Sequence, residues 1–182
     1  MLLPYFQWVS DARMSQAISQ SPWAFAVIES VHLLALAVIG GAVLMLDLRL
    51  LGLGLRDQPI ERVARDAFPW FVGSLIVMLI TGVGLFMSEA TKCYYSTSFW
   101  VKMTSLLLAM IFAFTVRRNV ALAGEGRLRP IWLKLVAVVS LVLWAVNVVA
   151  GRMIANNWFD CDKQPQPSIV NVAAGCVVGD SR

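Results

Sequence analysis

The residues best placed for chemistry are a carboxylate and an imidazole three positions apart. Glu29 precedes His32, which is the single histidine of the chain. Residues at this spacing share one face of a helix, so Glu29 could hydrogen bond one ring nitrogen of His32 and orient the ring. The other ring nitrogen would then be available to a ligand, and the chemistry in question is coordination of haem iron or of copper.

Haem and copper would use different neighbours of His32. A haem b group would take His32 as an axial ligand, with Arg152 and Lys102 binding its propionates. One histidine excludes bis-histidine ligation within one chain, which leaves a five-coordinate haem, a histidine–methionine pair or ligation across a subunit interface. Copper(I) accepts imidazole and thioether ligands, so the copper alternative joins His32 to methionines at the predicted outer helix ends. Those methionines are Met87, Met103 and Met153.

A structural role is the third interpretation of these residues. Ionisable side chains inside a membrane are costly and usually face a partner or a cavity. Glu29, His32, Asn147 and Arg152 could therefore form a polar network that fixes the register of the helices and touches no ligand. The sequence leaves the haem, copper and structural interpretations open.

Motifs of common enzymes are missing from the sequence. It has no His-Glu-x-x-His motif, no phosphate-binding glycine loop and no dinucleotide fingerprint, so we predict no catalytic residue. The net charge is +4 and the pI is near 9.3. Because the basic residues lie in short segments between apolar runs, membrane topology explains them, and nucleic acid is not an expected partner.

Four apolar runs must position these side chains. A bilayer core needs about 20 apolar residues of helix, and residues 23–46, 69–88, 99–116 and 131–151 meet that length. The composition agrees, with 59% hydrophobic residues, 14% charged residues and a mean hydropathy of +0.72. We predict an all-α, integral membrane four-helix bundle over residues 1–160. Residues 1–22 of this domain contain an N-terminal interfacial helix, and an extracytoplasmic tail over residues 161–182 follows the domain.

The distribution of arginine predicts the orientation of the bundle. The segments 47–68 and 117–130 each hold four arginines, and the positive-inside rule places both in the cytoplasm. These arginines are Arg49, Arg56, Arg62, Arg65, Arg117, Arg118, Arg127 and Arg129. Both termini are then extracytoplasmic, and the ionisable residues of the spans gather in the outer half of the membrane.

All three cysteines fall on the predicted outer side. They are Cys93, Cys161 and Cys176. An oxidising compartment favours a disulfide there. Cys161–Cys176 and Cys93–Cys161 are the two leading pairings, and the sequence does not choose between them.

Several short motifs resemble a known group of proteins. Glu29-Ser30-Val31-His32, Gly40-Gly41, Asp47-Leu48-Arg49-Leu50-Leu51-Gly52, Pro69-Trp70 and Thr81-Gly82 are similar to motifs of small bacterial inner-membrane proteins of unknown function. Those proteins are similar in turn to copper-resistance D-type membrane domains. The resemblance covers about residues 23–116. It implies a helical inner-membrane bundle with an outward-facing site for copper or haem, although one histidine departs from a multi-histidine pattern.

We therefore expect a multi-pass protein of a bacterial inner membrane that acts as an accessory or structural subunit of a larger membrane complex. Its expected partners are membrane lipids and either other membrane subunits or further copies of itself. The alternative is a haem- or copper-binding protein for electron transfer or copper handling, with His32 as the ligand.

Overall fold

The computed structural model of the chain describes residues 3–123 and 129–156. Throughout those residues the regular structure is helical, and no strand occurs among them. Four helical segments are long and apolar enough to cross a membrane. They are α3 (Pro22–Leu51), α4 (Ile60–Ser88), the continuous run α6 (Thr97–Phe112), η1 (Ala113–Arg117) and α7 (Arg118–Leu122), and α8 (Pro130–Asn156). The predicted all-α four-helix membrane bundle is confirmed.

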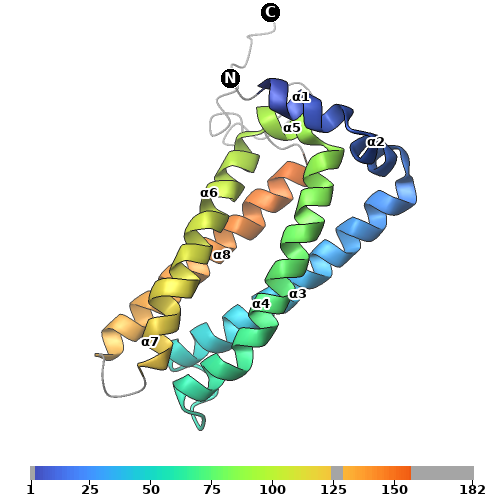
Figure 1. The fold of residues 1–182 in the computed structure, drawn as a ribbon. Helices are drawn as coiled ribbons and strands as arrows, with labels where there is room; N and C mark the ends of the chain where they lie inside the picture. Colours follow the sequence, from blue (N-terminus) through green and yellow to red (C-terminus); the bar gives the residue numbers. More distant parts are fainter. Residues whose placement is uncertain (1–2, 124–128, 157–182) are drawn as a thin grey trace, which may run out of the picture.

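Three short helices cover one end of this bundle, which we call the capped end. They are α1 (Leu3–Asp11), α2 (Arg13–Gln20) and α5 (Ala90–Tyr95). Helix α1 lies against α5, and α2 lies against the ends of α3 and α4 (Figure 1). The helix predicted within residues 1–22 is thus present as two short helices, and its position at a membrane surface stays a prediction. The opposite end of the bundle is called the α7 end.

Local sequence signals define both ends of α3. Ser21 is the N-cap, and its side chain accepts a hydrogen bond of 3.3 Å from the backbone N–H of Ala24. Pro22 follows at the first helical position, where its missing N–H costs nothing. At the other end Gly52 adopts φ 77°, and its N–H bonds to the carbonyl of Arg49 at 3.1 Å. Glycine suits this left-handed cap because it has no Cβ.

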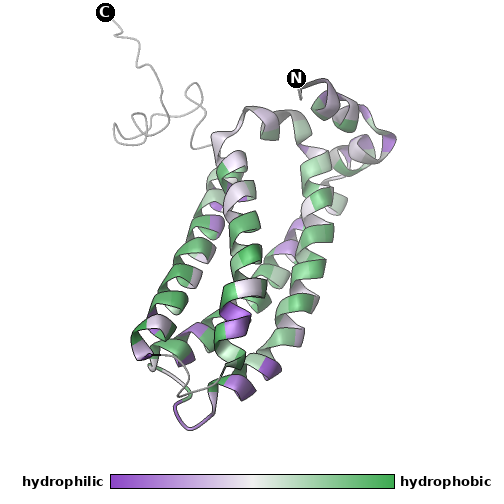
Figure 2. Ribbon diagram, turned by 60° about the vertical axis from the view of Figure 1, so that its left-hand side comes forward, coloured by the Kyte–Doolittle hydropathy of each residue, from purple (hydrophilic) through white to green (hydrophobic). Residues whose placement is uncertain are grey.

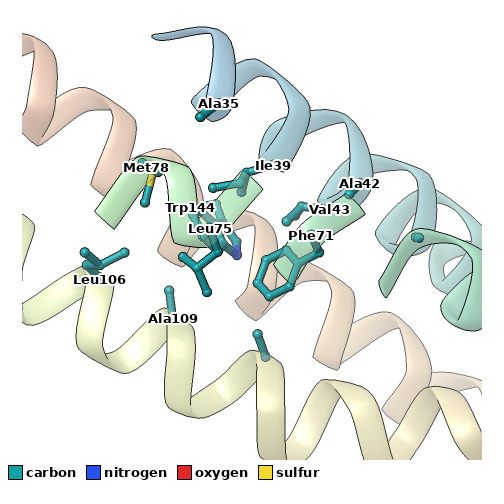
Figure 3. Close-up of a cluster of buried hydrophobic side chains, with 12 residues drawn as sticks. Ala35, Ile39, Ala42, Val43, Phe71, Leu75, Met78, Leu106, Ala109 and Trp144 are labelled. Carbon is teal, nitrogen blue, oxygen red and sulfur yellow. The ribbon is translucent and has the colours of Figure 1, made fainter. Parts of the chain in front are cut away.

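The four long helices pack as two pairs, α3 with α4 and α6 with α8, and α3 also contacts α8. A central cluster of buried apolar side chains joins all four (Figure 3), and it includes Ile39, Phe71, Ala109 and Trp144. A second cluster lies toward the α7 end and includes Leu50. A third lies at the capped end around Phe6, Cys93 and Phe99. Colouring by hydropathy shows apolar residues along the long helices and polar ones toward the loops (Figure 2).

The helices are longer than the predicted spans, most of all at the α7 end. Residues 47–51, 60–68 and 117–122 are helical, whereas the sequence analysis assigned them to loops. The hydropathy pattern stops at the first charged residue of each segment, but the backbone continues its hydrogen bonding beyond it. This correction brings Asp47 and Arg117 into the body of the bundle.

Candidate functional site

His32 lies on α3 and contacts α4. Its Nδ1 atom is 2.9 Å from the hydroxyl oxygen of Thr81. The same hydroxyl lies 2.8 Å from the carbonyl of Val77, one turn earlier on α4. Serine and threonine in apolar helices commonly donate their proton to this carbonyl. The hydrogen bond of His32 therefore joins two helices.

The contact with Thr81 bears on the tautomer of His32. A Thr81 hydroxyl that donates to the carbonyl of Val77 has an oxygen that can accept from Nδ1–H of the imidazole. In this tautomer Nε2 carries the lone pair and is able to ligate a metal or to accept a proton. The imidazole thus contacts Thr81 in the structure, whereas Glu29 was the predicted partner. Glu29 is half-buried and has no hydrogen bond or ion pair among the described residues.

The glycines around His32 leave space for long polar side chains. A Cβ atom built at Gly82 would lie 3.4 Å from Cε1 of His32, so the imidazole edge packs on the α4 backbone. A Cβ atom at Gly151 would lie 3.4 Å from Nζ of Lys102, so the ammonium lies against α8. Lys102 and His32 are close enough to interact electrostatically. One imidazole and one ammonium therefore share the interior of the bundle.

These side chains belong to a polar layer, which we define as His32, Thr81, Lys102 and Asn147. Each lies one helical turn from a member of the central cluster, in the direction of the capped end. The neighbouring members of the cluster are Ala35, Met78, Leu106 and Trp144. Asn147 is 6% exposed, and its Nδ2 atom has no hydrogen-bond partner among the described residues. The layer thus presents unused hydrogen-bond donors inside an apolar bundle.

The other residues predicted to bind haem or copper differ in how exposed their side chains are. Arg152 is exposed, Met87 and Met153 are half-buried, and Met103 is 37% exposed. The backbone carbonyl of Met87 accepts a hydrogen bond from the Ser15 hydroxyl. Within residues 3–123 and 129–156 no group of three or more histidine, cysteine, aspartate or glutamate side chains is arranged to hold a metal. The copper set and the four-residue polar network stay predictions.

Only one of the three cysteines of the predicted disulfides lies within the described residues. Cys93 is buried in the apolar cluster at the capped end. Cys161 and Cys176 lie outside the described residues, so both proposed pairings stay predictions.

A buried ion pair inside the bundle was missed from the sequence. Asp47 on α3 is fully buried, and its Oδ1 atom accepts a hydrogen bond of 2.9 Å from Nε of Arg117. Arg117 is 6% exposed and also donates to the carbonyl of Val43 at 3.1 Å. Ser140 of α8 lies beside the same carboxylate. Removing one partner of such a buried pair typically costs about 3 to 5 kcal/mol, so this pair is a strong constraint on helix packing.

A helix-face pattern could have revealed half of this ion pair. Ile39, Val43 and Asp47 follow one another at intervals of four, so Asp47 continues the buried face of α3. Arg117 ends η1, a π-helical turn within the third span. Such turns are rare and occur often at functional sites. No simple pattern in the sequence indicates the π-helical turn.

Comparison with known proteins assigns the chain to a family, but no activity is known for that family. No curated protein and no solved structure matches the chain. One family model, described as a family of unknown function (DUF6644), matches residues 5–157, which include all four long helices. The match supplies no link to copper-resistance D-type domains. On this evidence the chain is a four-helix membrane protein that belongs to the family of unknown function DUF6644.

Proposed function

We propose that this protein is a small accessory or structural subunit of a larger complex in a bacterial inner membrane. The observation that supports the proposal best is a stripe of small residues on the outside of α3. Ala26, Ser30, Ala37 and Gly41 lie on one side of this helix with Leu33 between them, and all five residues are exposed. A Cβ atom built at Gly41 would meet nothing within 4 Å, so the glycine serves no packing inside the chain.

Small residues on the outside of a membrane helix favour a helix partner over lipid. They allow two helix backbones to approach closely, and close packing drives association where no hydrophobic effect operates. Ser30 keeps its own hydroxyl bonded to the carbonyl of Ala26 at 2.7 Å, so the stripe presents no unsatisfied donor. The partner is therefore an apolar helix of another subunit or of a second copy.

Enlarging one residue of the stripe tests this function. We expect Ala37→Leu to shift the protein from a large complex to a smaller species on a native gel after extraction in a mild detergent. Ala145→Leu is the matched control, because Ala145 is also a small exposed residue but lies on α8. The proposal fails if both variants migrate like the wild type, or if both reduce the complex equally.

The proposed orientation follows from the basic residues near the α7 end. Arg56, Arg62 and Arg65 are exposed there, beside the connection between α3 and α4. We propose that this end faces the cytoplasm and that both termini are extracytoplasmic. In a variant whose native Cys93, Cys161 and Cys176 are replaced by serine, a single cysteine at position 62 should react with a membrane-permeant maleimide only. Reaction with an impermeant reagent from outside the cell would reverse the orientation.

A second candidate function is haem binding at His32, and the contact between the imidazole and Thr81 favours it. The Nδ1–H of His32 is held by Thr81, and histidines that ligate metals commonly have their second nitrogen fixed in this way. Lys102 places a positive charge close to His32, which suits a ligand with carboxylates and disfavours a bare copper ion. A bound haem would supply one-electron redox chemistry, with His32 as an axial ligand and Lys102 as a propionate contact.

An absorption spectrum separates the two candidates. If haem binding is correct, protein purified from cells supplied with haem precursor shows a Soret band that His32→Ala abolishes. Thr81→Ser, which keeps the hydroxyl, should retain that band. Absence of the band in the wild-type protein, with metal analysis showing no copper, removes the cofactor candidate and leaves the subunit proposal standing.

A further inference from the structure

A cavity near the α7 end brings three arginines together, and it lies apart from the polar layer. Its volume is about 110 Å³, and it is enclosed by α3, α4 and the run from η1 to α7. Small and apolar side chains such as Ala42 and Ala113 form much of its wall. Arg65, Arg117 and Arg118 also line it. A cavity of this volume has room for several waters or for one tetrahedral anion.

The three guanidinium groups differ in their burial and in their ion-pair partners. Arg117 is buried and is held in place by Asp47 and by the carbonyl of Val43. It forms a rigid part of the cavity wall, and the carboxylate of Asp47 largely balances its positive charge. Arg65 forms an exposed ion pair of 2.5 Å with Glu61 on its own helix. Exposed pairs of this kind are weak and exchange readily for another anion.

Arg118 is the cation that remains for a ligand. Its guanidinium lies over the ring of Phe68 at 4.7 Å, and among the described residues it has no hydrogen bond or ion pair. The aromatic contact holds the guanidinium at the cavity while its N–H groups remain unused. Among the described residues, the three arginines that line the cavity pair with Asp47 and Glu61 only, which leaves one positive charge without an acidic partner.

The π-helical turn explains why two consecutive arginines serve one cavity. The backbone N–H of Arg118 bonds to the carbonyl of Ala113, five residues earlier, which widens the helix at this point. Arg117 is buried toward α3, and Arg118 reaches the ring of Phe68 on α4. Both side chains line the cavity.

We propose that this cavity binds a phosphate group. Guanidinium groups recognise phosphate oxygens through paired, charge-assisted hydrogen bonds, and an arginine is preferred to a lysine where such geometry matters. The cavity lies toward the α7 end of helices that are apolar enough to cross a membrane, near exposed basic residues. A phospholipid headgroup would lie at this level if the α7 end meets the membrane surface. The same chemistry would accept the phosphate of an anionic lipid or a phosphate anion from water.

Ligand binding to the full-length protein distinguishes the two sources. The probes are inorganic phosphate and phosphatidylglycerol, each added to delipidated protein in a neutral detergent. Phosphatidylcholine is the zwitterionic comparison, because its own choline cation balances the charge of its phosphate. Native mass spectrometry and the thermal unfolding midpoint report binding. If the ligand is a lipid, phosphatidylglycerol binds at least tenfold more tightly than phosphatidylcholine, and inorganic phosphate has no effect. If the source is aqueous, inorganic phosphate alone raises the unfolding midpoint.

Arginine variants show whether the cavity is responsible. We expect Arg118→Gln to weaken binding of the active probe about tenfold and Arg118→Lys to restore only part of it. Arg62→Gln is the matched control, because Arg62 is exposed on the same end of the bundle and does not line the cavity. The proposal is overturned if neither probe binds better than phosphatidylcholine, or if Arg62→Gln weakens binding as much as Arg118→Gln does.

Discussion

The buried pair of Asp47 and Arg117 should dominate the stability of the α7 end. Replacing Asp47 by leucine leaves the Arg117 guanidinium without its carboxylate partner in a site where it is only 6% exposed. The expected loss is about 3 to 5 kcal/mol of unfolding free energy. Arg117→Leu should cost a similar amount, because it strands the fully buried carboxylate and also removes the hydrogen bond to the carbonyl of Val43.

The double variant gives the sharper result. With both charges removed, the apolar replacements fill the site, and the combined cost should fall well below the sum of the two single costs. We expect a coupling energy of about 2 to 3 kcal/mol in a double-mutant cycle. The measurement is reversible unfolding in mixed detergent micelles, followed by circular dichroism as the denaturing detergent increases.

An exposed ion pair on the same end provides the control. Arg65 and Glu61 also form an ion pair, but their side chains are 69% and 47% exposed. Glu61→Gln should therefore change the unfolding free energy by less than about 1 kcal/mol. Additive losses for Asp47→Leu and Arg117→Leu, or equal losses for the buried and exposed pairs, would refute the reasoning.

Three further predictions concern substitutions at Thr81, Gly82 and Gly52. Thr81→Val removes the acceptor for His32 and should cost about 1 kcal/mol, and the nitrogen chemical shifts of the imidazole should lose the signature of a fixed tautomer. Gly82→Leu should displace the imidazole, because a Cβ atom there already lies 3.4 Å from Cε1 of His32, whereas Gly73→Leu meets nothing within 4 Å and should leave the same spectrum unchanged. Gly52→Ala forces a left-handed backbone at φ 77° on a residue with a Cβ atom, so thermal unfolding should show a loss of about 1 kcal/mol, and an unchanged midpoint would contradict it.

The sequence was sufficient to predict the four membrane helices, because each apolar run is long enough by itself to cross a bilayer. It was insufficient at the helix ends. The first and third predicted spans stopped at residues 46 and 116, immediately before Asp47 and Arg117. Hydropathy counts each charge as a cost, but two opposite charges on different helices neutralise each other once the helices pack.

In the candidate site, the sequence likewise indicated one residue but not the contact that this residue makes with another helix. His32 could be singled out from its residue type and its place inside an apolar run. Its partner could not, since the local candidate Glu29 lies on the same helix, whereas Thr81 reaches His32 only through the packing of α3 on α4. The cavity at the α7 end depends on a π-helical turn and three converging helices, and none of these is a property of one segment.

Crosslinking from the α3 stripe tests the central claim most directly. A photoreactive amino acid at position 37, activated in intact membranes, should join the chain to another polypeptide in a discrete band, and mass spectrometry of that band would show whether the partner is a different subunit or a second copy. The same group at position 145 should give lipid adducts instead. Lipid adducts alone at position 37 would contradict the account, because they would mean that the small-residue face of α3 meets only the bilayer.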